Sequence, residues 1–120
     1  MSKKTLIIGA SKNPERYSYK AAEKLLAHKH DIYMIGNRPG VLFDREIAKQ
    51  KSPFTDVDTV TMYVSAKNQT GYYEYIMSLE PRRVIFNPGT ENPDFEKQLE
   101  EQGILAEEAC TLVLLATNVY

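Results

Sequence analysis

The chain has 120 residues, of which 42% are hydrophobic and 26% charged, with a net charge of -1. This composition is that of an ordinary globular protein and excludes a disordered chain or a fibrous repeat. The length fits one domain, so we expect residues 1–120 to fold around a single core. No stretch approaches the roughly 20 apolar residues of a membrane span or the about 7–15 of a secretory core. We therefore expect a cytoplasmic protein.

The charges are unevenly distributed along the chain. Residues 1–40 hold eight Lys/Arg against three Asp/Glu, whereas residues 91–120 hold one against seven. Such blocks usually form solvated helix faces, but the basic first third could also hold an anionic ligand. Nucleic acid is disfavoured, because the isoelectric point is near 6.1 and no basic run is interleaved with aromatic residues.

Short runs of apolar and β-branched residues predict five strands. They cover residues 5–8, 32–35, 59–64, 83–86 and 104–106. Apolar residues at a 3.6-residue period predict the helices that separate them. The helices cover residues 18–28 and 68–79, a segment that buries Phe95 and Leu99 and ends at Gly103, and residues 111–116, which would fit a strand nearly as well. Residues 41–58 have no clean period and predict at most a helical turn at 53–57.

Strands that alternate with helices indicate an α/β fold with a mostly parallel sheet. We expect one doubly wound, Rossmann-like sheet of five strands in the order 3-2-1-4-5, covered by helices on both faces. Ligands bind such sheets outside the carboxyl ends of the strands, where the order reverses. This rule predicts a site between the first and fourth strands, at Gly9-Ala10-Ser11 and Asn87-Pro88-Gly89.

The loop after the first strand has the features of an anion-binding turn. Gly9 permits a tight turn, and the N–H groups at the start of the following helix can bind phosphate. Ser11 and Pro14 stand where a dinucleotide G-x-G-x-x-G motif has its second and third glycines, so the motif is incomplete. Arg16 is a further candidate phosphate partner. Alternatively, the glycine at this strand-to-helix turn is needed only for the backbone geometry and not for a ligand.

The end of the second strand argues against NAD. An NAD site has an acidic residue there for the ribose hydroxyls, but this chain has Asn37-Arg38-Pro39. A cation suits a phosphorylated ribose, either the 2′-phosphate of NADP or the 3′-phosphate of coenzyme A. The alternative is that Arg38 is a solvated loop residue.

Residues for catalysis are few. His28 and His30 face apart on a helix and have no third ligand for a metal near them in sequence. Cys110, the only cysteine, excludes a disulfide framework and a cysteine-rich zinc site, and Glu107 and Glu108 would raise rather than lower its pKa. A G-x-S-x-G nucleophile motif is absent. We expect neither a metal site nor a catalytic residue.

Five loop motifs together resemble the small stand-alone CoA-binding proteins, which are similar to the CoA-binding domain of the succinyl-CoA synthetase alpha subunit. The motifs are Gly9-Ala10-Ser11-Lys12-Asn13-Pro14 with Arg16-Tyr17-Ser18, Asn37-Arg38-Pro39, Tyr63-Val64-Ser65, Phe86-Asn87-Pro88-Gly89 and Glu108-Ala109-Cys110-Thr111. The resemblance covers the chain from Lys4 to about Tyr120.

The resemblance implies a Rossmann-like domain that binds coenzyme A. The loop from Gly9 to Ser18 would hold the diphosphate, and residues 37–39 would lie near the adenosine. Val64, Ser65, Pro88 and Gly89 would line the same crevice, with Cys110 at its edge. Asn87 stands where many members have glutamine. The synthetase's phosphorylated histidine belongs to a further domain without a counterpart here, so its ligase chemistry does not carry over.

Three hypotheses remain at this point. The leading one is a non-catalytic module that binds coenzyme A or an acyl-CoA. The second is a minimal NADP-dependent oxidoreductase or a subunit of one, suggested by Arg38. The third is a redox-sensing or interaction module in which Cys110 forms a mixed disulfide with bound coenzyme A. Apolar, tyrosine-rich surfaces permit a homodimer or a protein partner without requiring either.

Overall fold

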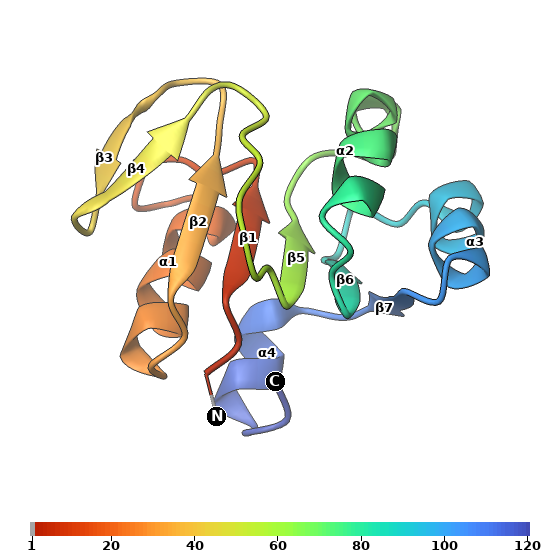
Figure 1. Ribbon diagram of the computed structural model, residues 1–120. Helices are drawn as coiled ribbons and strands as arrows, with labels where there is room; N and C mark the ends of the chain where they lie inside the picture. Colours follow the sequence, from red (N-terminus) through yellow and green to blue (C-terminus); the bar gives the residue numbers. More distant parts are fainter. Residues whose placement is uncertain (1) are drawn as a thin grey trace.

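The computed structural model describes residues 2–120, which form one mostly parallel sheet with helices on both faces (Figure 1). The strands are β1 (Thr5–Ile8), β2 (Ile32–Ile35), β3 (Gly40–Leu42), β4 (Arg45–Ala48), β5 (Thr59–Met62), β6 (Arg83–Phe86) and β7 (Leu105–Glu108). The helices are α1 (Tyr17–Ala27), α2 (Tyr73–Ser78), α3 (Pro93–Glu101) and α4 (Thr111–Ala116), with short 3-10 helices η1 (Ala66–Asn68) and η2 (Thr70–Tyr72) before α2.

The sheet has seven strands in the order β3-β4-β2-β1-β5-β6-β7. Only the β3–β4 pair is antiparallel. The α/β class is confirmed, but the prediction of five strands was wrong. The predicted order was wrong as well, because the expected third strand, β5, pairs with β1 instead of lying beyond β2. The place beyond β2 belongs to β4, so the order reverses between β1 and β5.

The β3–β4 hairpin was missed because its sequence lacks the usual signals. Its two-residue turn is Phe43-Asp44, with φ angles of 52° and 63° that asparagine and glycine adopt more readily. Arg45 donates from Nη1 to the carbonyl of Phe43 over 3.1 Å, and the Phe43 ring packs 5.2 Å from that of Tyr19 on α1. Contacts with α1 and within the hairpin therefore hold a turn that local preference does not favour.

Two other expectations differ from the structure. The expected helix over 68–79 is divided into η1, η2 and the shorter α2, and no helical turn forms at 53–57. The expected helices over 18–28 and 111–116 appear as α1 and α4, and three of the strands, β1, β2 and β6, have the predicted bounds. The length of a segment therefore did not decide the outcome, because the long period over 68–79 was wrong and the short segment 111–116 was right.

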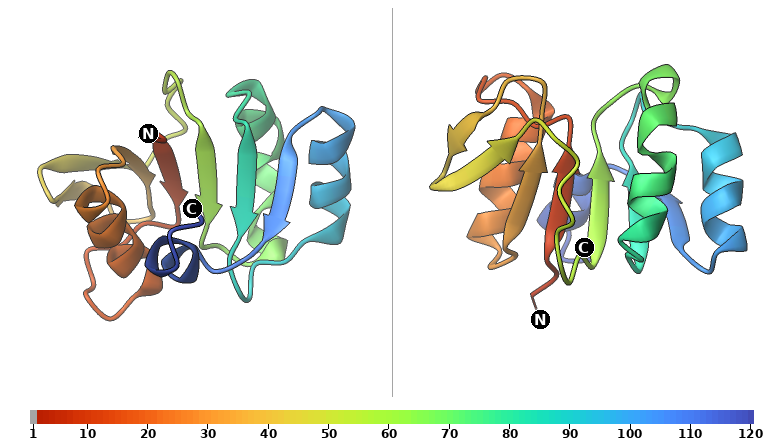
Figure 2. Two further views of the ribbon diagram at one scale, coloured as in Figure 1. Left: turned by 90° about the horizontal axis from the view of Figure 1, so that it is seen from below. Right: turned by 45° about the horizontal axis from the view of Figure 1, so that its top comes forward.

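Two apolar clusters fill the space on the two faces of the sheet. One joins Leu6, Val60 and Phe86 to Ile76 of α2 and Phe95 of α3. The second, on the opposite face, joins Ile7, Met34 and Ile47 to Leu25 of α1 and Leu115 of α4. Figure 2 shows α1 and α4 together on one side of the sheet, with α2 and α3 on the other. Alternate strand residues therefore point to opposite cores, as in a sheet covered on both faces.

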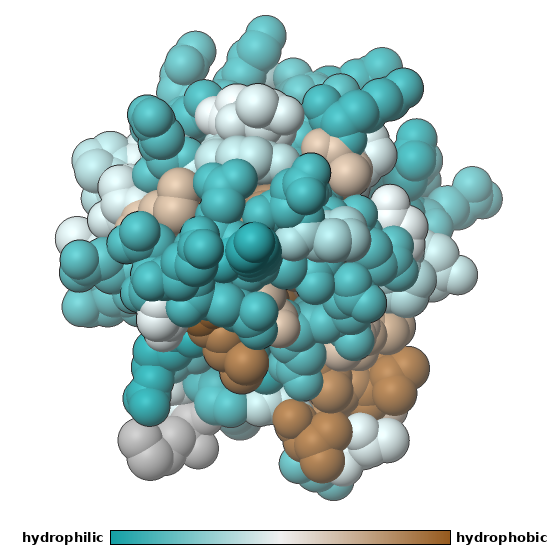
Figure 3. Space-filling model, turned by 90° about the vertical axis from the view of Figure 1, so that its right-hand side faces the viewer, coloured by the Kyte–Doolittle hydropathy of each residue, from teal (hydrophilic) through white to brown (hydrophobic). Residues whose placement is uncertain are grey.

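The outer surface carries some exposed apolar residues near β7 and α4. Leu105 is 55% exposed and Val113 57% exposed. Figure 3, which views the α3 side, shows hydrophobic side chains gathered low on this face. Within residues 2–120, no helix combines the length and the hydropathy that crossing a bilayer would require.

Candidate functional site

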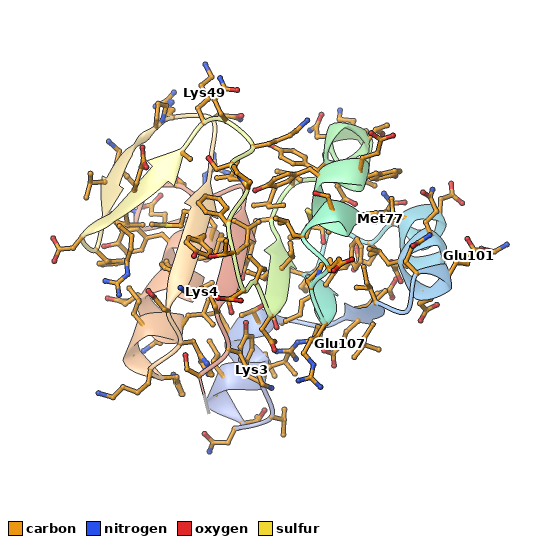
Figure 4. The ribbon with its side chains drawn as sticks, viewed as in Figure 1. Lys3, Lys4, Lys49, Met77, Glu101 and Glu107 are labelled. Carbon is orange, nitrogen blue, oxygen red and sulfur yellow. The ribbon has the colours of Figure 1, made fainter. Side chains whose placement is uncertain are left out.

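A cavity of about 740 Å³ lies outside the carboxyl ends of β1, β2, β5 and β6. These ends lie at the top of Figure 1, and Figure 4 shows Lys49, just after β4, at the same edge, with Lys3 and Lys4 at the opposite one. The loops that line it come from both sides of the point where the strand order reverses. They supply Gly9, Ala10, Ser11, Asn13, Glu15, Arg16, Tyr17, Ser18, Gly36, Asn37, Arg38, Tyr63, Val64, Ser65, Tyr72, Pro88, Gly89 and Thr90.

Gly9 lets the backbone after β1 pass close to the backbone at the end of β5. Its φ is +95°, and a Cβ there would lie 2.9 Å from the carbonyl oxygen of Tyr63. The N–H groups of Gly9 and Ala10 both donate to the carbonyl of Ile35 over 2.9 Å. No larger residue fits both the angle and the space, so the start of this loop requires glycine.

The rest of the loop is shaped by its own polar groups. The N–H of Asn13 donates to Ser11 Oγ, and that of Glu15 to Asn13 Oδ1, each over 3.0 Å. The N–H of Arg16 donates to the carbonyl of Asn13 over 3.0 Å. These bonds bring the start of α1 to the cavity.

The first turn of α1 offers free donors to this cavity. No side chain caps the helix, and no acceptor within residues 2–120 receives the N–H groups of Tyr17, Ser18 and Tyr19. Unsatisfied N–H groups and the helix dipole together favour an anion at a helix N-terminus. The geometry therefore suits a phosphate at residues 9–18.

The loop after β2 approaches the β1 loop at Gly36. A Cβ at Gly36 would lie 2.4 Å from the carbonyl oxygen of Ala10, so only glycine permits this approach. The approach carries Asn37 and Arg38 to the cavity rim. Neither Arg38 nor Arg16 belongs to any of the ion pairs within residues 2–120, which leaves both guanidinium groups available to an anionic ligand, although Glu15 also lines the cavity.

Tyr63, directly after β5, also lines the cavity. Its N–H continues the sheet by donating to the carbonyl of Ile8 over 2.8 Å. Burial raises the pKa of the Tyr63 hydroxyl to about 12, although hydrogen bonding with Thr111 and Thr61 partly opposes the rise. This hydroxyl therefore stays protonated at neutral pH and acts as a hydrogen-bonding group.

Asn87 supports the cavity from below and does not line it. Its Nδ2 donates to Thr61 Oγ1 over 2.7 Å and to the carbonyl of Met62 over 2.8 Å. Its Oδ1 accepts from the N–H of Thr111 over 2.9 Å, and the side chain is buried. The amide thus joins β5, β6 and the start of α4, and none of its groups is directed to a ligand.

The next residues, Pro88, Gly89 and Thr90, return to the cavity. Gly89 has a φ of +90°, yet a Cβ there would meet nothing within 4 Å. Its N–H donates to Glu91 Oε1 over 2.9 Å. Thr90 is held through its N–H and its hydroxyl, both of which donate to the carbonyl of Asn87.

Most of the residues singled out from the sequence line this one cavity. They are Gly9, Ala10, Ser11, Asn13, Arg16, Ser18, Asn37, Arg38, Val64, Ser65, Pro88 and Gly89. Four do not line it: Pro14, Pro39, Asn87 and Cys110. Cys110 is half-buried and immediately precedes α4. The sequence predicted a site between the first and fourth expected strands, which are β1 and β6. In the structure β5 lies between them, and the loops after β1, β5 and β6 all line the cavity.

Six lining residues were not singled out from the sequence, although Glu15 and Tyr17 lie within the loop expected to hold the diphosphate. The six are Glu15, Tyr17, Gly36, Tyr63, Tyr72 and Thr90. Gly36 had a usable signal, a glycine directly after a buried strand, and Tyr63 adjoined an expected pair. Tyr72 falls within the helix expected over 68–79, and the structure places it at the end of η2 instead.

Comparison with known proteins gives a family and several structural relatives. The model of a CoA binding domain family matches residues 3–116. An uncharacterized protein of known crystal structure is 44% identical over 100% of this chain and 99% of its own, with a TM-score of 0.97. None of the curated proteins matches the chain.

More distant structures share the fold. A hypothetical protein from Pyrococcus horikoshii OT3 is 23% identical over 98% of this chain and 84% of its own, with a TM-score of 0.86. The protein cell-free ID.343 from Thermus thermophilus is 21% identical over 99% of this chain and 91% of its own, with a TM-score of 0.82. At these identities the likeness concerns the fold alone.

Proposed function

We infer that this chain, which belongs to the CoA binding domain family, binds coenzyme A or an acyl-CoA in the cavity over β1, β2, β5 and β6. Family membership supports a CoA ligand in general. The finer assignment, that the Gly-Ala-Ser loop after β1 receives the diphosphate, rests on the geometry of this cavity.

The observation that carries the assignment is that free helix N–H groups and cations without an ion-pair partner among residues 2–120 line one cavity. The first turn of α1 and Arg16 offer donors to a diphosphate. Arg38 stands at the β2 end of the cavity, where a ribose phosphate would lie. The pantetheine arm would then extend along Val64, Ser65, Tyr72 and residues 88–90. Coenzyme A has a diphosphate for the start of α1 and a ribose 3′-phosphate for Arg38.

We propose binding without turnover. The residues that line the cavity include neither histidine nor cysteine, and their one carboxylate, Glu15, is exposed to solvent. A general acid or base works best with a pKa near the operating pH, and the pKa of Tyr63, at about 12, lies far above neutrality. The lining is therefore suited to hydrogen bonding and charge pairing.

Thermal unfolding with coenzyme A, dephospho-CoA, NADP, NAD and ATP in parallel tests this function. A ligand at about 100 times its dissociation constant adds about 2.7 kcal/mol to the free energy of unfolding and raises the midpoint. We expect coenzyme A to raise it more than dephospho-CoA, because only the former offers Arg38 a 3′-phosphate. A shift with NADP alone would favour the oxidoreductase, which Arg38 also supports, and overturn this proposal.

A charge placed in the loop locates the site. Ser11→Glu puts a carboxylate beside the phosphate position and should abolish the stabilisation by coenzyme A while the protein stays folded. Gln98→Glu adds the same charge on the exposed side of α3, away from the cavity. It should leave the stabilisation unchanged. Equal responses of the two variants would contradict the assignment to this loop.

A further inference from the structure

Gln69 is a fully buried polar residue between η1 and η2 that does not line the cavity. Its Nε2 donates to two carbonyls, that of Val64 over 2.9 Å and that of Thr90 over 2.7 Å. Val64 lies in the loop after β5 and Thr90 in the loop after β6, and both line the cavity. One NH2 group therefore bridges two loops that form the same wall.

The acceptor side of the same amide is also occupied. Gln69 Oε1 accepts from Asn92 Nδ2 over 3.0 Å. Asn92 begins α3, where its Oδ1 accepts from the N–H of Phe95 over 3.2 Å, and its Nδ2 also donates to the Tyr73 hydroxyl over 2.7 Å. A buried network in which each member is satisfied fixes one arrangement, because any shift leaves a donor or acceptor unpaired. The side chain of Gln69 is thus fixed by Asn92 on the side away from the two loops.

We propose that Gln69 is a positioning residue that sets the spacing of the two loops receiving the arm of coenzyme A remote from the adenosine. This inference rests on the function proposed above. The two hydrogens of one amide have a fixed separation, and they hold the carbonyls of Val64 and Thr90 at a corresponding spacing. A wall set before the ligand arrives lowers the ordering cost of binding.

Two ligands separate this role from a general loss of structure. Coenzyme A contacts both sides of the cavity, whereas adenosine 3′,5′-bisphosphate lacks the pantetheine arm. Gln69→Met keeps the length of the side chain and removes its hydrogen bonds. By calorimetry we expect it to weaken coenzyme A by about tenfold, the effect of a buried group left unpaired, and to change the affinity for the bisphosphate by no more than about twofold.

Gln69→Glu gives a readout that a purely structural role would not share. A carboxylate cannot donate to either carbonyl, but a protonated carboxyl can donate to one of them. The affinity of this variant for coenzyme A, relative to the parent protein, should therefore recover as the pH is lowered, and that of Gln69→Met should not. The pH dependence of Gln69→Glu against the parent protein remains measurable if Gln69→Met fails to fold.

Tyr75→Phe is the matched control. It removes a hydrogen bond from the Tyr75 hydroxyl to the carbonyl of Ser52, remote from the lining of the cavity, and should leave both affinities unchanged. Unchanged CoA affinity in Gln69→Met, or equal weakening of both ligands, overturns the positioning role alone. A parent protein that binds neither ligand instead overturns the proposed function.

Discussion

The two sides of the cavity are built by different means. On the β1–β2 side, residues 9–18 and 36–38 reach their places through two glycines that let backbones touch, and the groups facing the cavity are free N–H groups and arginines. On the β5–β6 side, the buried amide of Gln69 binds the carbonyls of Val64 and Thr90, and that of Asn87 binds the end of β5. The first side is thus suited to charge, and the second to a fixed shape.

The largest expected effect comes from a side chain that obstructs the close contact between the two loops of the β1–β2 side. Gly36→Ala places a Cβ against the carbonyl of Ala10, and because backbone cannot yield as a side chain does, we expect a loss of about 3 kcal/mol in the free energy of unfolding. Urea denaturation measures it. Gly89→Ala is the control, because only its φ of +90° is unfavourable, and it should lose about 1 kcal/mol. Equal losses would show that the close approach is unimportant.

The β5–β6 side should respond to the loss of one amide. Asn87→Ala leaves the carbonyl of Met62 and the N–H of Thr111 without their partner, and we expect the free energy of unfolding to fall by about 2 kcal/mol. Asn68→Ala removes an exposed amide that donates to Ser65 Oγ, and it should cost no more than about 0.5 kcal/mol. If Asn87→Ala were as mild as this control, the amide would not be what holds α4 to the sheet.

A charge on the β1–β2 side should matter for binding and hardly for stability. Arg38→Gln removes an exposed cation without an ion-pair partner among residues 2–120. We expect the affinity for coenzyme A to fall about tenfold, as for the loss of a charged hydrogen bond, with an unfolding midpoint close to that of the parent. Affinity for dephospho-CoA, which lacks the 3′-phosphate, should not change. A similar loss for both ligands would move Arg38 away from that phosphate.

The smallest effect at neutral pH concerns Tyr63, where the two sides meet. Burial raises its pKa to about 12 from a usual 10.0, so the folded protein keeps a proton that the unfolded chain releases. The resulting stability is complete below pH 10 and is lost as the pH rises toward 12. Tyr63→Phe should reduce the loss of stability at alkaline pH. The measurement is the free energy of unfolding at a series of increasing pH values. Burial also raises the pKa of Tyr75 to about 12. Tyr75 should therefore account for the alkaline loss of stability that remains in Tyr63→Phe.

The sequence predicted the elements whose residues are uniform in character. β1, β2 and β6 each contain at least three consecutive apolar residues, and α1 has a regular apolar period, so burial largely determines them. The β3–β4 hairpin was not predictable in this way, because Val41 is exposed and Arg45 and Glu46 interrupt β4. The wrong strand order is a separate error, because β5 pairs with β1 whether or not the hairpin is counted.

The β1–β2 side of the site was easier to predict than the β5–β6 side. Glycine, serine and arginine after a strand have known uses in binding phosphate, so Gly9 and Arg38 could be singled out from the chain alone. Gln69 and Asn92 lie 23 residues apart and meet only in the folded protein, and neither belongs to a recognised motif. Their partnership depends on how α2 and α3 pack, which local patterns do not specify.

The outermost strands of the sheet have a consequence for the protein at high concentration. An open edge can recruit strands from other molecules and start aggregation. Here one edge is β3, three residues long and bent back as a hairpin, and the other is β7, which ends in Glu107 and Glu108. Short strands and like charges both hinder edge-to-edge addition, so the sheet is protected against growth at both ends, and neutralising the two glutamates should make solutions of the protein more prone to cloud on heating.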